Sequence, residues 1–329
     1  MSLEESIASR LSNEKGFVSG EKLANELGVS RAAIWKAVSN LRSQGIDVAA
    51  VRNKGYLLET PYDAIGEESL AQALGQLGCM VDIEYLKKVG STNDIAKGYA
   101  RSSATARRAV VAGMQTAGRG RRGRAFYSPF GCGVYLTTIV SGREIPADPQ
   151  MLTIAAAVAV CQAVEQAVGA SCDIKWVNDV YLGGRKVCGI LTEAEIDLET
   201  GRPAWAVVGI GINVYEPQGG WPEDLKGKVG AVANEARQGL RARLAAATIA
   251  AFYHLVDDFE DGQVLDEYRS RSNLIGRDAD VSFEGVEERR VRIVGITDDL
   301  KLLCRDANNE HAPIEELSSI DTSISLLVS

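Results

Sequence analysis

Histidine and paired cysteine are scarce in this chain. Its 329 residues include 2 histidines and 6 cysteines. The cysteines are scattered, at positions 79, 132, 161, 172, 188 and 304, and no two stand in a Cys-x-x-Cys spacing. Structural zinc sites and disulfide frameworks need such residues at set spacings. We therefore expect neither kind of site, and we expect reduced thiols in a cytoplasmic protein.

Long apolar runs are also missing. A membrane-spanning helix needs roughly 18 consecutive apolar residues. The segment 151–168 comes closest, but four polar residues interrupt it. The N-terminal residues include Glu4 and Glu5 and lack the apolar core of a signal peptide. The sequence therefore predicts no membrane association.

An excess of positive charge is the third absence. The chain has 36 basic and 44 acidic residues, with a formal net charge of −8. A protein that binds nucleic acid over its whole surface is usually basic. Any DNA contact must therefore come from a local patch. The length predicts two or three domains, and 46% hydrophobic with 24% charged residues is ordinary for a globular protein.

Residues 1–60 carry the pattern of a winged helix-turn-helix. Ser19 and Ser30 stand where helix N-caps are expected, each before apolar residues at helical spacing. Residues 52–55 separate two short β-rich segments and form the basic tip of a hairpin. A helical interaction domain without DNA binding is the alternative. The predicted DNA-contacting residues are Ser30, Arg31, Lys36, Asn40, Arg52 and Lys54.

Trp35 lies in the middle of the predicted recognition helix. Two interpretations of this residue are open: it packs on the first helix, or it alters which DNA sequence is read.

A linker at 60–66 precedes a central α/β domain at 67–272 and a β-rich domain at 273–329. In the central domain, periodicity predicts helices at 67–77, 91–101, 149–168 and 240–259. It predicts strands at 83–89, 110–115, 133–140, 173–176 and 204–214, and a hairpin over 180–191 about Gly183 and Gly184. In the last domain we expect strands at 280–283, 290–296, 300–305 and 320–328.

The segment Gly118–Arg124 concentrates three glycines and four arginines in seven residues. Arginine offers a rigid fork of donors for phosphate or carboxylate, and glycine lets the backbone approach a ligand. We expect this Gly/Arg loop to be mobile when empty, because its like charges repel, and to be ordered by an anionic ligand. A solvated basic loop or a nucleic-acid-binding segment is the alternative.

The string Gln115–Arg124 resembles the signature loop of biotin protein ligases. Three further segments match in family order: Ser91-Thr92-Asn93, Lys175–Asp179 with Arg185–Leu191, and Gly209–Asn213. The resemblance covers nearly the whole chain. It implies an α+β protein with an N-terminal winged helix-turn-helix, a central mixed-sheet α/β ligase domain of the biotin/lipoate protein ligase type, and a C-terminal SH3-like β-barrel.

This resemblance implies an ATP-dependent biotin protein ligase. Such an enzyme activates biotin as biotinyl-5′-AMP, with ATP and Mg²⁺, and transfers it to a lysine of a biotin carboxyl carrier protein. The winged helix implies a second role as a biotin-responsive repressor that binds operator DNA as a homodimer, with the adenylate as corepressor. In the family the signature loop orders on binding.

The resemblance assigns roles to individual residues. Lys186, Arg119 and Arg121 are the implied catalytic residues. The implied biotin-binding residues are Ser91, Thr92, Asn93, Gln115, Gly118, Arg119, Gly120, Arg121, Lys186, Gly189 and Gly209. The implied adenylate-binding residues are Arg119, Arg121, Arg122, Arg124, Phe126, Lys186, Asn178 and Asn213. No metal ligand is identified with assurance by the motifs; Asp179 is the residue we associate with the Mg²⁺ of ATP.

Two positions depart from the family pattern. Val177 replaces a common proline in Lys-Trp-Pro-Asn-Asp, and because valine suits a strand we expect the strand at 173–176 to run one residue further. Leu327 stands where repressor-type relatives have a basic residue near the adenylate, so that contact is expected to be missing.

Two other functions remain open. One is a biotin-sensing regulator that has lost ligation, which the intact Lys186 and Gly/Arg loop disfavour. The other is a lipoate ligase or octanoyltransferase, which the Gly/Arg string and the winged helix disfavour. A dinucleotide site at Gly209–Asn213 fails, because the third glycine and the following helix are missing.

Overall fold

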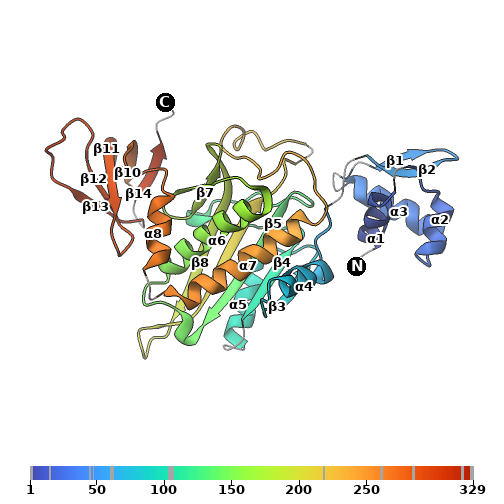
Figure 1. Cartoon of the computed structure of the whole chain (residues 1–329), viewed down its shortest axis with the longest axis horizontal. Helices are drawn as coiled ribbons and strands as arrows, with labels where there is room; N and C mark the ends of the chain where they lie inside the picture. Colours follow the sequence, from blue (N-terminus) through green and yellow to red (C-terminus); the bar gives the residue numbers. More distant parts are fainter. Residues whose placement is uncertain are drawn as a thin grey trace.

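The computed structural model describes residues 3–14, 16–43, 46, 48–59, 63–102, 107–217, 219–259, 262–283, 286–319 and 322–326. Leu327 and the first part of the predicted linker, 60–62, lie outside these ranges. A winged-helix unit and a C-terminal sheet stand at opposite ends of a larger central domain (Figure 1).

The N-terminal unit has three helices and a two-stranded wing, as predicted. Its elements are α1 (Leu3–Ser12), α2 (Gly20–Glu26), α3 (Arg31–Ser43), β1 (Val48–Val51) and β2 (Gly55–Leu58). The side-chain oxygens of Ser19 and Ser30 each accept a backbone N–H three residues on, at 3.1 Å, so both N-cap predictions are confirmed. Buried apolar residues from all three helices form a core separate from that of the central domain.

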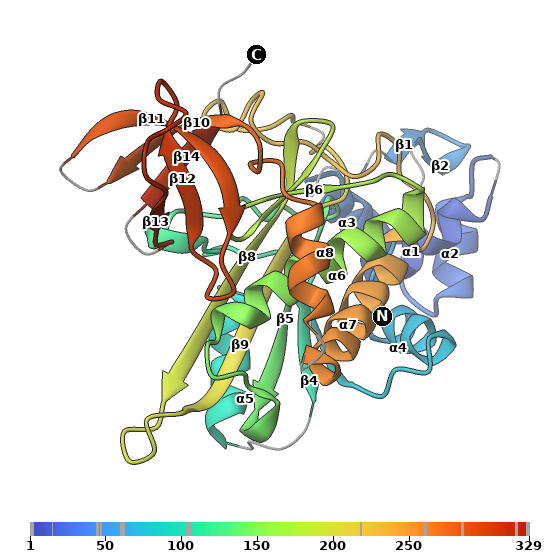
Figure 2. The same ribbon diagram turned by 60° about the vertical axis from the view of Figure 1, so that its left-hand side comes forward.

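The central domain is built on a mixed seven-stranded sheet. In space the strands run β3-β4-β5-β9-β8-β7-β6, and only β3 and β4 pair in parallel. Their bounds are β3 (Asp82–Leu86), β4 (Arg108–Ala112), β5 (Gly133–Ser141), β6 (Asp173–Lys175), β7 (Asp179–Leu182), β8 (Arg185–Ile196) and β9 (Pro203–Asn213). The long β8–β9 hairpin projects beyond the helices (Figure 2).

The two faces of this sheet are covered differently. The helices α4 (Glu67–Gln76), α6 (Gln150–Val168) and α7 (Leu240–Asp257) share one large core with one face. On β9, Val208, Ile210 and Ile212 point into that core. Val207 on the opposite face packs with α5 (Thr92–Ser102). Because side chains alternate along a strand, Gly209 and Gly211 lie on the α5 face with Val207.

Helix α6 is long and apolar enough to cross a membrane by length and composition alone. It is the core helix of the central domain, however, because 12 of its 19 residues are buried. Helix α7 also buries 12 of its 18 residues, which is deeper burial than its amphipathic pattern predicts.

The C-terminal residues form a five-stranded antiparallel sheet in the order β13-β12-β11-β10-β14. The strands are β10 (Asp278–Phe283), β11 (Val286–Ile296), β12 (Leu302–Asp306), β13 (Glu315–Leu317) and β14 (Thr322–Leu326). Among the described strands, β13 and β14 stand at opposite edges and do not pair. The sequence did not predict β13, nor the helix α8 (Gln263–Ser270) that precedes this sheet.

Several strand limits differ from their predictions; for example, β8 runs on to Ile196 and β11 begins at Val286. Strands β3 and β4 end before the residues predicted, because the chain turns into loops at 87 and 113. The expected extension of the strand through Val177 is wrong: β6 ends at Lys175, and the Trp176–Val177 peptide is cis. Tyr268 of α8 donates its hydroxyl to the Val177 carbonyl at 3.1 Å.

Buried hydrogen bonds between Asp63 and Arg241 fix the point where the chain enters the central domain. Asp63 and Arg241 expose 3% and 1% of their surfaces. The Asp63 Oδ2 atom accepts the Tyr215 hydroxyl and the Arg241 backbone N–H, both at 2.7 Å. The Arg241 guanidinium donates to the carbonyls of Gly133 and Asp63. Burial raises the pKa of Asp63, although the hydroxyl of Tyr215 and the charge of Arg241 both act to lower it.

We expect Arg241→Leu to lower the free energy of unfolding by about 3–5 kcal/mol, because Asp63 then remains buried without its cation. Urea denaturation measures this change. Arg243→Leu, on the exposed side of the same helix, is the matched control and should change stability by less than about 0.5 kcal/mol. The double variant Asp63→Leu/Arg241→Leu should recover part of the loss. A single variant as stable as the control would contradict the assignment.

Candidate active site

Three glycines on the adjacent strands β8 and β9 let other residues pack directly against the backbone on the α5 face of the sheet. A methyl group on Gly209 would lie 2.1 Å from Asn93 Oδ1, and one on Gly211 would lie 2.5 Å from the Phe126 ring. A methyl group on Gly189 would lie 3.3 Å from Phe126 and from Lys186. Contacts under 3.0 Å are not sustainable, so only glycine lets Asn93 and Phe126 rest on these strands. We call this surface the glycine floor.

The Ser91-Thr92-Asn93 corner stands at one edge of the glycine floor, and all three residues are buried. The backbone N–H and the hydroxyl of Thr92 both donate to Gln115 Oε1, at 2.8 and 3.0 Å. The Thr137 hydroxyl lies 2.8 Å from the Thr92 hydroxyl and 2.7 Å from Asn93 Oδ1. Residues that the sequence places far apart therefore form one polar wall.

Both ends of the Gly/Arg loop are tied to this wall. Gln115 Nε2 donates to Ser128 Oγ at 3.1 Å, and Ser128 Oγ donates to the Phe126 carbonyl at 3.0 Å. The Phe126 N–H donates to the Gly118 carbonyl at 2.9 Å. Gly118 has no room for a side chain, since a methyl group there would lie 2.6 Å from the Phe126 carbonyl oxygen. These contacts therefore hold the two ends of the loop close together.

The body of the loop is a tight turn. Residues Arg121–Gly123 form a single 3₁₀ turn, and Arg122 has φ 56°, in the left-handed region that favours glycine. The Gly120 N–H donates to the Arg124 carbonyl at 2.7 Å. Arg122 and Arg124 lie on the exposed surface of the turn. This is a defined conformation, and the ordering of the loop by a ligand stays a prediction.

The arginines of the loop reach in three directions. Arg119 forms a bidentate pair with Asp94 on α5. Arg121 donates to the Ser319 carbonyl at 2.6 Å and to Asn178 Oδ1 at 3.4 Å. Arg122 donates to the Thr322 carbonyl at 3.3 Å. Burial, helped by the neighbouring Arg122, lowers the pKa of Arg121, which as a guanidinium remains charged. Residues of the C-terminal domain therefore hold two of the loop arginines through their backbone carbonyls.

Lys186 lies at the other edge of the glycine floor. Its Nζ is 2.6 Å from Asp179 Oδ1. Asn178 is fixed by its neighbours, since its Nδ2 donates to the Ile190 carbonyl at 2.9 Å. Burial lowers the pKa of Lys175, and the cations of Lys186 and Arg124 act in the same direction. Lysines and arginines therefore gather here around one carboxylate, an arrangement suited to binding an anion.

Metal binding has little support from the side chains themselves. The described residues contain no group of three or more His, Cys, Asp or Glu that could hold an ion. Asp179 is the acidic group that pairs with Lys186. One carboxylate suits a Mg²⁺ that keeps its waters and arrives on a substrate phosphate, and it does not suit a resident ion.

The structure thus brings together most of the predicted ligand-binding residues. Gly189 and Gly209 are part of the glycine floor, and Phe126 and Lys186 lie against it. The loop arginines belong to the segment that leads to Phe126. Asn213, at the end of β9, is buried, and its carbonyl accepts the Val232 N–H at 2.9 Å. A cavity of about 240 Å³ lies on the α6 side of β8, where Arg121 and Asn178 line it together with Thr153, Thr192 and Ser319.

The predicted DNA-contacting residues form a separate surface on the winged-helix unit. Arg31, Lys36, Arg52 and Lys54 are exposed. Trp35 exposes 66% of its surface, so it is not buried against the first helix. An effect of Trp35 on DNA reading stays a prediction. Asn40 instead donates to Glu4 Oε1 at 3.0 Å, so its predicted contact with DNA competes with a contact to α1.

Sequence reasoning missed several residues of the wall: Thr137, Ser128, Asp94, Lys97 and Glu193. Thr137 carried a usable signal, because Thr137-Thr138 is a polar pair inside an otherwise apolar strand. Asp94 directly follows the Ser91-Thr92-Asn93 motif, but the sequence indicated only that a helix begins there. The others gave no signal, because their roles arise from contacts between distant segments.

Comparison with known proteins agrees with this arrangement. Residues 85–213 match the biotin/lipoate A/B protein ligase family, and residues 4–57 match a helix-turn-helix domain. The chain is similar to the bifunctional ligase/repressor BirA of Bacillus subtilis, with 40% identity over 212 residues. That alignment covers 64% of this chain and 64% of the relative, so just under two thirds of the relative is matched.

Two further comparisons extend over more of the chain. The biotin–[acetyl-CoA-carboxylase] ligase of Mycobacterium tuberculosis is 30% identical over 259 residues, which is 76% of this chain and 91% of the relative. The structure of a biotin protein ligase from Aquifex aeolicus in complex with biotin and ATP covers 75% of this chain and 99% of its own, with a TM-score of 0.61 and 24% identity, and so supports the fold. The chain belongs to the biotin/lipoate A/B protein ligase family.

Proposed function

We propose that this chain is an ATP-dependent biotin protein ligase that also acts as a biotin-responsive repressor. The observation that carries the proposal is the convergence of the Ser91–Asn93 corner, the Gly/Arg loop and Lys186 on one glycine floor. The corner and floor suit a small ring with polar edges, and the cations suit phosphate. The family match, and the similarity to a biotin–[acetyl-CoA-carboxylase] ligase over 76% of this chain, support this choice of substrate.

The proposed first step joins biotin to AMP. A carboxylate oxygen of biotin attacks the α-phosphorus of ATP, the bond to the β-phosphate oxygen breaks, and pyrophosphate leaves. Negative charge spreads over the reacting phosphoryl group, and positioned cations stabilise it. Lys186, Arg119 and Arg121 are the residues we assign to this charge. Arg122 and Arg124 are exposed on the same turn and are assigned to the outer phosphates.

The proposed second step transfers biotin to a lysine of a biotin carboxyl carrier protein. The lysine amine attacks the carbonyl of the mixed anhydride, an amide forms, and AMP leaves. A closed Gly/Arg loop keeps water from the anhydride until the acceptor arrives. Mg²⁺ enters this scheme with ATP, and its chemistry is to neutralise phosphate charge; Asp179 is the residue we place nearest to it.

The proposed repressor function uses the winged-helix unit. Adenylate that orders loops around the site favours a homodimer, and a dimer sets two α3 helices on two operator half-sites. Ligation and repression then compete for the same molecules. We further propose a cytoplasmic location, domain limits at 1–60, 67–272 and 273–329, and an SH3-like class for the C-terminal sheet, which its five antiparallel strands support.

The ligase proposal is tested by biotin-dependent exchange of labelled pyrophosphate into ATP. We expect exchange in the wild type and a fall of about 10²–10³-fold in Lys186→Ala, because the cation nearest the transferring group is lost. Lys301→Ala is the control, since Lys301 pairs with Asp299 and Glu316 in the C-terminal sheet.

Three outcomes separate the candidate functions. Exchange that depends on lipoate in place of biotin would favour a lipoate ligase. Biotin binding without exchange in the wild type would favour a sensor that has lost ligation. Equal exchange in Lys186→Ala and Lys301→Ala would contradict the role of Lys186.

Ordering of the Gly/Arg loop is tested by limited trypsin digestion. We expect biotin with ATP to slow cleavage at residues 119–124 by about tenfold, because ligand binding lowers the population of open loop. Lys54, exposed in the turn between β1 and β2 and followed by a glycine, is an internal control whose cleavage should not change. Equal cleavage with and without ligand would exclude the ordering.

A further inference from the structure

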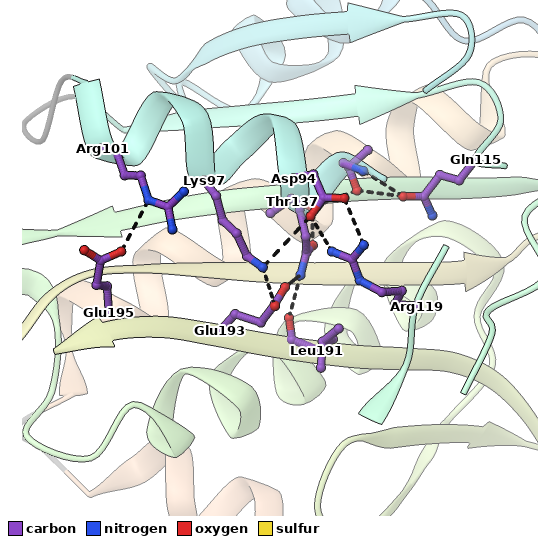
Figure 3. A network of polar contacts seen from close by, with 11 residues as sticks. Asp94, Lys97, Arg101, Gln115, Arg119, Thr137, Leu191, Glu193 and Glu195 are labelled. Atoms are coloured by element: carbon purple, nitrogen blue, oxygen red, sulfur yellow. Dashed lines mark hydrogen bonds and ion pairs between the residues drawn. The ribbon is translucent and has the colours of Figure 1, made fainter. Parts of the chain in front are cut away.

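A network of ion pairs joins the Gly/Arg loop to the glycine floor along the outside of α5 (Figure 3). At one end, the Arg119 guanidinium meets both oxygens of Asp94, with Nη1 2.9 Å from Oδ2. Bidentate pairs fix the orientation of a guanidinium as well as its position. Arg119 is therefore held by the first turn of α5 and does not extend freely into solvent.

At the other end, the network holds the Asn93 side chain. Asn93 Nδ2 donates to Glu193 Oε2 at 2.7 Å and to the Leu191 carbonyl at 3.3 Å. Asn93 Oδ1 accepts the Thr137 hydroxyl at 2.7 Å. Both amide protons and the amide oxygen are thus used within the protein. In this geometry the Asn93 side chain is fixed against Gly209.

Lys97 connects the two ends. Its Nζ is hydrogen-bonded to Glu193 Oε1 and lies 4.0 Å from Asp94 Oδ1. The charges of Arg119, Asp94, Lys97 and Glu193 alternate in sign along the path. The side chains of Lys97 and Glu193 are only 21% and 29% exposed, so solvent screens the middle of the path less than it screens an open surface pair.

We propose that Asp94 is a positioning residue that holds Arg119 in its ligand-binding orientation and so keeps the adenylate in the site. The proposal rests on the proposed ligase function. An arginine already oriented before the ligand arrives loses less rotamer freedom on binding, so the bound state is retained longer. The hydrogen bond from Arg119 also lowers the pKa of Asp94, which keeps this carboxylate charged at neutral pH.

The opposing interpretation is that Asp94 and Arg119 form an ordinary surface pair. Exposed pairs contribute little to stability, and Asp94 is 52% exposed. The chain contains a comparison pair: Arg101, about two turns further along α5, pairs with Glu195 on β8 at 3.3 Å, and both are more than half exposed. In Figure 3 the Arg101–Glu195 pair and the Asp94–Arg119 pair lie on either side of Lys97.

The test compares Asp94→Asn with Glu195→Gln in the full chain. Chemically prepared labelled biotinyl-5′-AMP is bound to each protein and chased with unlabelled adenylate, so the measured dissociation rate does not depend on catalysis. We expect Asp94→Asn to raise this rate about tenfold, since a hydrogen bond to a charged group is lost. Glu195→Gln should match the wild type within about twofold. Both variants should melt at the wild-type temperature, and Asp94→Glu should restore most of the retention.

A dissociation rate in Asp94→Asn equal to that of Glu195→Gln would overturn the proposal. A fall in kcat for ligation with unchanged adenylate dissociation would overturn it as well, because positioning acts on retention. Wild-type protein that binds the adenylate but shows no pyrophosphate exchange would refute the ligase function while leaving the role of Asp94 to be decided by the same rates. Wild-type protein that does not bind the adenylate would overturn both.

Discussion

The site depends on one steric constraint: two side chains lie directly on the backbone of adjacent strands. Asn93 and Phe126 occupy the space that side chains at Gly209 and Gly211 would need. This close approach sets how near α5 and the loop can come to the sheet. The same face carries Val207, which packs with α5. Asn93 of α5 lies against Gly209, and Phe126, which follows the loop, lies against Gly211.

The charge distribution follows from how the loop is anchored. Its two ends are held by neutral hydrogen bonds through Gln115 and Ser128. Arg121 donates to the Ser319 carbonyl, and Arg122 donates to the Thr322 carbonyl. Arg119 instead forms a bidentate pair with the Asp94 carboxylate. The loop arginines are therefore anchored on different segments of the chain, and their guanidinium groups are of the kind that suits phosphate.

The C-terminal sheet has a role that its separate position does not suggest. None of the sequence motifs lies in this part of the chain. The Ser319 and Thr322 carbonyls nevertheless accept hydrogen bonds from the loop across a separation of about 200 residues. Arg121 also contacts Asn178, so one side chain joins three segments of the chain. Movement of the loop and movement of this sheet are coupled by these contacts.

Local patterns predicted most of the elements but few of the contacts. Helices α4 and α6 followed from apolar spacing, and Ser19 and Ser30 followed from capping chemistry. The motifs identified Lys186 and the arginines as candidate ligand-binding residues. Only the folded structure shows that the Phe126 ring lies where a side chain at position 211 would be. The Asp63–Arg241 pair spans 178 residues, and no local pattern signals it. Strand β6 ended early, α8 and β13 were not predicted, and Thr137 was passed over because a threonine in a strand is ordinary.

The most direct test of this account is a crystal structure of the chain with bound biotinyl-5′-AMP. We expect the biotin ring on the α5 side of the sheet over Gly209, the Phe126 ring displaced or reoriented above Gly211, and the Lys186 Nζ within hydrogen-bonding distance of the anhydride. An adenylate bound instead in the cavity of about 240 Å³ on the α6 side of β8 would contradict the account, because the glycine floor would then have no part in holding the ligand.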